Sequence, residues 1–225
     1  SDKYPGISPY AYCAWNPMKL VDPDGEEVIN AHTSKIAYLS QKIASLQSRL
    51  SNCTTKRQNR RIQRQINRSN KQLTEQKEME SMVNTAIQDL KEYGNGEFEK
   101  LDNLKDRQGN SVDAYISMEV NLRDKAGKIL LGSMAMDLNS YGTVSSKYGK
   151  NTVHISINTL CKSNPGKTLA HEGGHAIYEV QFPNAVQAFY KETGTTPNGG
   201  HEPGNPSGNY ADECENKFVE NQNKR

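Results

Sequence analysis

The sequence NPGKTLAHEGGHAIYEV, residues 164–180, decides the fold of the second half of the chain. We predict that this stretch forms a helix. Apolar residues flank its polar centre, as is typical of a helix that buries one side: Leu169, Ala170, Ala176, Ile177 and Val180. The adjacent glycines Gly173 and Gly174 each cost a helix about 0.8–1.0 kcal/mol relative to alanine. We therefore expect backbone or substrate to pack closely against them.

The centre of this predicted helix carries the pattern H-E-x-x-H, formed by His171, Glu172 and His175. Histidines four residues apart lie one turn apart on one helix face, so both imidazoles can reach a tetrahedral Zn²⁺ at ~2.0–2.1 Å. Glu172 would lie beside the metal rather than on it, where its carboxylate can take a proton from water. The pattern predicts metal-assisted hydrolysis. The structural alternative is a pair of histidines that only form hydrogen bonds.

A third protein ligand must come from farther along the chain, because a catalytic zinc site has three protein ligands and one position for water. Position 181 is glutamine, which excludes a third histidine six residues after His175. We predict that Pro206 and Ser207 begin a last helix, with Ser207 as its N-cap. This helix and the loop before it contain the candidates.

Glu215 is our first candidate for the third ligand. It shares a face of the last helix with Ala211 and Phe218, which must pack inward if this helix is to bury anything. A carboxylate on that face needs a partner, and a metal supplies one. His201 and Tyr210 would then be free to donate a hydrogen bond to the oxyanion of a tetrahedral intermediate. Three residues remain as alternative ligands: His201, Glu213 and Asp212.

The H-E-G-G-H pattern on a helix resembles the motif of the zincin metallopeptidases. The resemblance implies that His171 and His175 are zinc ligands and that Glu172 is the general base. A glutamate on a second helix is the third ligand in gluzincins, although the spacing to Glu215 is longer here than in many of them. The activity implied is zinc-dependent cleavage of a peptide or protein substrate.

Alternating apolar residues before this helix predict a small antiparallel sheet. They are Val112, Ala114, Ile116, Met118 and Val120 in a first run, and Val153, Ile155 and Ile157 in a last one. Residues 124–127 are typical of a hairpin turn that leads into a further run at 128–136. We expect the strand at 152–157 to be able to pair with an extended substrate. The predicted fold class is α+β, with a zincin-like domain over residues 94–225.

Residues 30–93 differ from this domain in their pattern. Apolar residues recur at spacings of three and four from Ile36 to Leu50 and from Ile62 to Leu90, which predicts a narrow helical seam. The intervening residues 51–55 have weak helix propensity and can form a turn. We therefore predict a long antiparallel helical hairpin. One continuous helix is the alternative, because no Gly or Pro interrupts the segment.

The predicted hairpin is strongly basic over its first two thirds. Residues 28–74 contain no acidic residue, and seven basic ones follow one another closely: Lys56, Arg57, Arg60, Arg61, Arg64, Arg68 and Lys71. A basic helix can follow phosphates, but no aromatic residue is interleaved here to stack on bases. We interpret the run as a solvated helix face and expect no nucleic-acid partner. Binding of an acidic partner, such as a cognate inhibitor protein, is the alternative.

The first residues form a third kind of segment. The stretch YPGISPYAYCAWNPMKLVDPDGEE, residues 4–27, has four prolines and a turn-forming D-P-D-G, so a regular helix cannot run through it. It resembles the end of the core region in Rhs/YD-repeat proteins, with Trp15 where that family usually carries a small or polar residue. The resemblance makes residues 1–29 an Rhs core tail. It implies that the rest is a variable C-terminal module, often a toxin, secreted or exported within a larger cell-surface protein.

Composition sets limits on the other classes of function. Hydrophobic residues make up 34% of the chain and the mean hydropathy is −0.86, so part of it builds little core. No apolar run is long enough for a membrane-spanning helix, and a net charge of +2 excludes a globally basic protein. Four dispersed cysteines without a CxxC pair exclude thiolate zinc fingers and thioredoxin-type redox sites. A bridge between Cys161 and Cys214 stays open.

A second function from another class also fits the sequence. The chain can be a non-catalytic interaction module whose helical region binds a partner and whose zinc site is structural or vestigial. A fourth protein ligand, such as His201 together with Glu215, would favour a structural site. An open position beside Glu172 would favour the enzyme.

Overall fold

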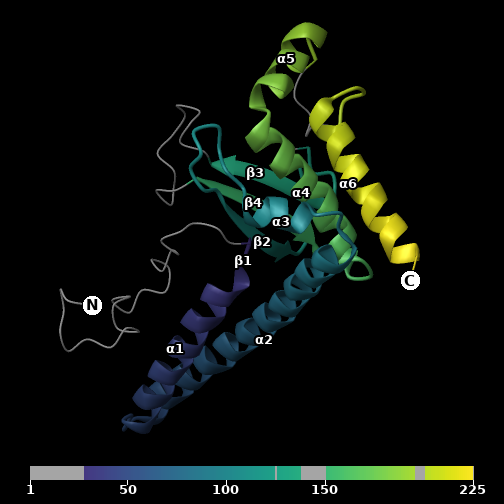
Figure 1. Cartoon of the computed structure of the whole chain (residues 1–225). Coiled ribbons are helices and arrows are strands. Elements are labelled where there is room, and N and C mark those ends of the chain that lie inside the picture. Colours follow the sequence, from purple (N-terminus) through teal and green to yellow (C-terminus); the bar gives the residue numbers. More distant parts are fainter. Residues whose placement is uncertain (1–27, 125, 138–150, 196–200, 225) are drawn as a thin grey trace, which may run out of the picture. The chain divides into compact units, whose positions relative to one another are not determined.

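The structure is a computed structural model that describes residues 28–124, 126–137, 151–195 and 201–224 (Figure 1). The segment that resembles an Rhs core tail, residues 4–27, lies outside the described residues. Six α-helices and one four-stranded sheet make up the described part, which confirms the α+β class. None of its helices is long and apolar enough to cross a membrane.

The chain divides into two compact units. We call residues 31–78 the hairpin unit, and residues 28–30 together with 79–224 the α+β unit. The sequence predicts that the hairpin extends to residue 93, whereas the structure groups residues 79–93 with the α+β unit. The physical reason is burial: Val83, Ala86 and Leu90 belong to the larger hydrophobic core.

The hairpin unit consists of α1 (His32–Ser51) and the first part of α2 (Lys56–Tyr93). The helical conformation stops between them, so the predicted hairpin is confirmed and a continuous helix is excluded. Its core is small and consists of Leu46, Ile62 and Ile66, against which Leu50 and Cys53 pack. Such a seam leaves most of both helices in contact with water.

The sheet of the α+β unit has the order β1-β2-β4-β3. β1 (Val28–Asn30) and β2 (Asp113–Glu119) are parallel, β2 and β4 (Thr152–Asn158) are parallel, and β3 (Gly132–Asp137) is antiparallel to β4. The predicted antiparallel sheet is therefore wrong, because the sheet is mixed. Alternation predicts a strand, whereas strand direction depends on the long connections that parallel pairs require.

The predicted turn at 124–127 is present, since the Gly127 amide donates to the Asp124 carbonyl at 3.0 Å. It leads into β3, but β3 pairs with β4. β4 consequently lies between two strands and has no free edge, so the prediction that it pairs with a substrate is wrong. Among the described strands, β3 is the one at the edge beside β4.

One face of the sheet forms the main core. In register, Ala114 opposes Val153, Ile116 opposes Ile155 and Met118 opposes Ile157, and all six are buried as predicted. Val120, predicted to continue this face, is 60% exposed because β2 ends at Glu119.

Four more helices complete the α+β unit: α3 (Glu97–Asp102), α4 (Pro165–Gln181), α5 (Pro183–Thr193) and α6 (Pro206–Asn223). α6 runs beside α4 (Figure 1). A side chain at Gly174 would come within 2.8 Å of the Ala211 Cα, so the expected close approach is confirmed there. At Gly173 the nearest atom would be 3.7 Å away, an ordinary contact. Ala211 and Phe218 are buried, as the predicted face of α6 requires.

Candidate metal centre

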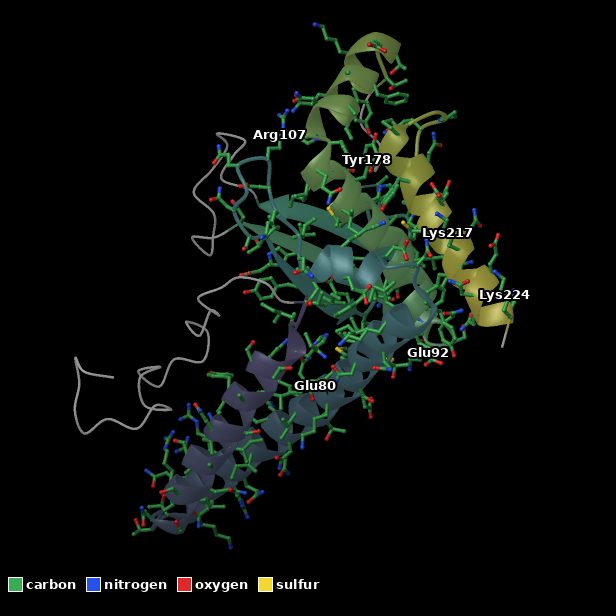
Figure 2. All side chains as sticks on the ribbon, viewed as in Figure 1. Glu80, Glu92, Arg107, Tyr178, Lys217 and Lys224 are labelled. Carbon is green, nitrogen blue, oxygen red and sulfur yellow. The ribbon has the colours of Figure 1, made fainter. Side chains whose placement is uncertain are left out.

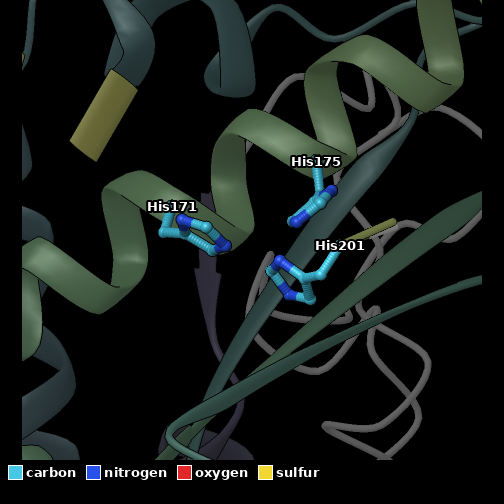
Figure 3. A group of neighbouring side chains, drawn as sticks. All are labelled: His171, His175 and His201. Atoms are coloured by element: carbon cyan, nitrogen blue, oxygen red, sulfur yellow. The ribbon is translucent and has the colours of Figure 1, made fainter. Parts of the chain in front are cut away.

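Three histidines gather beside α4. His171 and His175 lie one turn apart on that helix, and His201 lies in the turn that leads into α6. Figure 3 shows their rings pointing toward one another, with ring centroids 5.0–5.2 Å apart. One nitrogen of each ring lies within 4.8 Å of the other two, a group that could hold a metal ion. His171 and His175 are almost fully buried and His201 is exposed.

The hydrogen bonds of His175 leave one ring nitrogen facing this group. Its Nδ1 lies 2.8 Å from the Ser207 Oγ, and that hydroxyl donates to the Glu179 Oε1 at 2.9 Å. The opposite nitrogen, Nε2, is buried and has no hydrogen-bond partner. A buried polar atom without a partner costs about 1–3 kcal/mol. A bound metal ion would remove that cost, so the residues present fit a metal.

His171 lies beside two carboxylates. Its Nδ1 is 3.0 Å from the Glu215 Oε2 and 3.5 Å from the Asp212 Oδ1, but this buried nitrogen has no hydrogen-bond partner, as is also true of the His175 Nε2. Burial lowers the pKa of His171, and burial together with the neighbouring His171 and His201 lowers the pKa of His175 to about 3. Both imidazoles are therefore neutral at pH 7, the form in which histidine binds metals.

The structure places Glu215, our first candidate for the third ligand, with other partners. Its carboxylate pairs with Lys167 at 2.9 Å and with His171 at 3.0 Å. A second potential metal group contains Glu215, Asp212 and His171 but not His175. The prediction that Glu215 joins both motif histidines is therefore not supported. Glu215 lies on the predicted face of α6, but Lys167 supplies the partner that a carboxylate on that face needs.

The remaining predicted site residues have separate surroundings. Glu213 pairs with Lys217, which Figure 2 labels on α6. The Tyr210 hydroxyl accepts a hydrogen bond from Lys100 at 3.1 Å, and its ring packs near Tyr178 of α4, also labelled in Figure 2. The structure thus groups Tyr210 with Lys100, and it brings His201, the proposed oxyanion donor, to the motif histidines instead.

Glu172 lies under the start of β3. It is 7% exposed, and burial, with the nearby charges of Glu179 and Glu215, raises its pKa to about 7. A side chain at Gly132 would come within 2.5 Å of the Glu172 Oε1. Glycine at position 132 therefore leaves the room that this carboxylate occupies. No periodic pattern in the sequence pointed to Gly132.

Sequence reasoning also missed how α6 begins. Asn205, not Ser207, is the N-cap, because the Asn205 side chain accepts from the Ser207 amide at 2.9 Å and Pro206 is the first helical residue. An asparagine directly before a proline was the available signal. Glu179, one turn beyond His175 on α4, was detectable from its i+4 spacing.

A small polar cluster holds the turn that carries His201. The Glu202 Oε2 accepts hydrogen bonds from the Tyr190 hydroxyl at 3.1 Å and from the Asn205 amide group at 3.0 Å. Asn205 also donates to the Tyr190 hydroxyl at 3.0 Å. This ties the end of the turn to α5.

Of the four cysteines, three lie in the described residues, and Cys53, Cys161 and Cys214 are all free. The bridge between Cys161 and Cys214 that the sequence left open is thus not formed. Comparison of the chain with protein-family models, with curated proteins and with solved structures found no match.

Proposed function

We propose that this chain is a zinc-dependent peptidase. Two observations carry the proposal: His175 belongs to a group with His171 and His201 that could hold a metal ion, and its buried Nε2 has no hydrogen-bond partner. A group of three imidazoles is a donor set typical of a catalytic zinc site that leaves a further position open.

His171, His175 and His201 would hold the metal, so His201 takes the place that the sequence analysis gave first to Glu215. A zinc ion bound there would supply Lewis acidity toward a carbonyl oxygen and lower the pKa of water. Glu215 would instead orient His171, because its carboxylate lies 3.0 Å from the His171 Nδ1.

Glu172 is the general base of the proposed reaction. A base is most efficient when its pKa lies near the working pH, and the pKa of Glu172 is about 7 because the carboxyl group is buried. Its carboxylate would accept a proton from the attacking water and pass it to the leaving amine. The position of Glu172 directly after a candidate ligand on α4 keeps it beside the group rather than in it.

An extended peptide would bind along β3 in this proposal. β3 is the described strand at the edge beside β4, and its first residue, Gly132, lies against Glu172. A peptide that adds to such an edge forms backbone hydrogen bonds with it. Its backbone would then pass close to the Glu172 carboxylate.

The biological setting rests on the resemblance of residues 4–27 to the end of an Rhs core. We propose that the peptidase is the toxin or effector module of a larger exported Rhs-type protein. A cognate inhibitor protein is the partner that such a module implies.

Two measurements on the purified chain test the peptidase proposal. Elemental analysis should find one zinc per chain, and mass spectrometry of a mixed peptide library should find cleavage that 1,10-phenanthroline stops. Glu172→Gln should keep the zinc and lower the cleavage rate by about 10²–10⁴-fold, because it removes a base and no ligand. Loss of zinc in this variant would make Glu172 a ligand. Full zinc without cleavage of any peptide would favour the non-catalytic interaction module.

A further inference from the structure

Ser207 is a fully buried residue whose hydroxyl group contacts two side chains of another helix. It lies at the start of α6 and is 0% exposed. Serines at such positions commonly accept a hydrogen bond from a free amide of the first helical turn. Here Asn205 is the N-cap, so the Ser207 hydroxyl is available for other partners. Those partners are Glu179 and His175.

The direction of these hydrogen bonds follows from the number of protons. A serine hydroxyl has one proton to donate, and Ser207 donates it to the Glu179 Oε1 at 2.9 Å. The contact of 2.8 Å between the Ser207 Oγ and the His175 Nδ1 must then be donated by the histidine. A neutral imidazole has one N–H, so the proton at Nδ1 leaves a lone pair on Nε2.

We infer that Ser207, backed by Glu179, is a positioning residue that fixes the Nδ1–H tautomer of His175 and presents the Nε2 lone pair to the metal centre. The inference rests on the proposed function in one respect, which is that the centre binds a metal. Metal-bound histidines generally donate their second N–H to a carboxylate, a carbonyl or water. In this chain a serine from a different helix is placed between the histidine and the carboxylate.

The same turn holds both Ser207 and the third histidine. Asn205 is fully buried and connects three groups, since it accepts from the Ser207 amide and donates to Tyr190 and Glu202. Residues 201–207 therefore carry His201 at one end and the hydroxyl that orients His175 at the other. One hydrogen-bonded segment at the start of α6 thus carries His201 and also contacts His175.

The tautomer of His175 can be measured without any metal. Long-range ¹H–¹⁵N correlation spectra of the metal-free full chain distinguish a protonated Nδ1 from a protonated Nε2, with the assignment taken from His175→Ala. The wild type should show the Nδ1–H form. Ser207→Ala should shift His175 toward the Nε2–H form or a mixture, whereas Ser207→Thr, which keeps a hydroxyl group, should restore the wild-type spectrum.

Zinc affinity, measured by competition with a chelator, is a second and independent test. Ser207→Ala should weaken binding by about 10–100-fold, the usual effect of losing such an outer partner. Ser163→Ala, in the exposed loop before α4, is the matched control and should change neither the His175 tautomer nor the zinc affinity. Glu179→Ala serves if Ser207→Ala fails to fold. It frees the Ser207 proton to be donated to His175 and should also weaken the Nδ1–H preference.

Two results would overturn the inference. An Nε2–H tautomer in the wild type would mean that the hydrogen bonds run the other way, with a protonated Glu179 donating to Ser207. Unchanged tautomer and zinc affinity in a folded Ser207→Ala chain would mean that the serine only fills space. A wild type that shows the Nδ1–H form but binds no zinc would instead contradict the proposed function, so the two failures can be told apart.

Discussion

The hairpin unit and the α+β unit use their polar residues in opposite ways. Residues 31–78 contain eleven lysines and arginines and two glutamates, a formal charge of +9, and their small core is built around Leu46, Ile62 and Ile66. Residues 79–225 contain fifteen basic and nineteen acidic residues, a formal charge of −4. The charges of the hairpin lie mainly on exposed helix faces, whereas the α+β unit buries several of its polar groups.

The buried histidines of the two units illustrate this difference. Burying a polar or ionisable group is unfavourable unless it finds a partner. In the hairpin unit the buried His32 forms such a pair, with its Nδ1 2.9 Å from the Gln76 Oε1. In the α+β unit the His175 Nε2 is buried without a hydrogen-bond partner. Two buried histidines in one chain thus differ in the feature that identifies a candidate metal site.

The largest expected effect is the loss of zinc binding, which should distinguish His175 from His32. His175→Ala should abolish stoichiometric zinc binding, and so should His171→Ala, because two remaining ligands cannot hold the metal tightly. His32→Ala is the matched control, a buried histidine of the hairpin unit, and should keep one zinc per chain. Elemental analysis after dialysis measures this. Full zinc in either α4 variant would rule out the site.

The next comparison concerns the third ligand. His201→Ala removes a proposed ligand and should weaken zinc binding more strongly than Glu215→Ala. The Glu215 change removes an outer partner of His171 and should cost about 10–100-fold. Chelator competition on both variants measures the order. A larger loss in Glu215→Ala would restore the assignment that the sequence favoured.

Alanine substitutions at the two glycines of α4 test how closely α4 packs against α6. Gly174→Ala would put a Cβ 2.8 Å from the backbone of Ala211, so it should destabilise the chain by about 1–3 kcal/mol. Gly173→Ala meets its nearest atom at 3.7 Å and should be neutral, or stabilising by up to about 0.8–1.0 kcal/mol. Urea unfolding followed by circular dichroism compares the two. Equal effects would show that α4 and α6 do not pack as described.

The two units should also differ in how fast their cysteines are alkylated. Burial raises the pKa of Cys214 in the α+β unit to about 12, and only the thiolate reacts with an alkylating agent. Cys214 should therefore react slowly with iodoacetamide at pH 8 and faster as the pH approaches 12. Cys53, partly exposed in the hairpin unit, should be alkylated first. Peptide mapping by mass spectrometry follows both sites, and early labelling of Cys214 would contradict its burial.

The smallest effect is expected on the basic face of the hairpin unit. Replacing the exposed Arg60, Arg61 and Arg64 by glutamine should change stability by less than about 0.5 kcal/mol at each position. We also expect no appreciable binding of DNA or RNA at physiological salt. Fluorescence anisotropy with labelled oligonucleotides tests this. Micromolar binding that weakens with salt and disappears in the triple variant would show that the face follows phosphates.

Local periodicity accounts for what could be predicted from the sequence. The hairpin, the apolar runs of β2 and β4, the helix of residues 164–180 and the pairing of His171 with His175 all depend on repeats of two or of three to four residues. Each of these repeats extends over only a few residues, so a short stretch of sequence is enough to detect it. The charge run and the buried face of α6 belong to the same class.

Tertiary structure alone decided the rest, because it depends on which distant segments meet. The direction of β2 and β4 follows from their connections, which alternation does not encode. Glu215 and His201 were both compatible with the sequence, and only the structure shows that Lys167 pairs with Glu215 while His201 joins both α4 histidines. The sequence predicts Ser207 as the N-cap of α6. In the structure Asn205 is the N-cap, and the Ser207 hydroxyl contacts His175 instead. Tertiary packing determines which side chain about 30 residues away becomes a contact partner, and this packing follows no local repeat in the sequence.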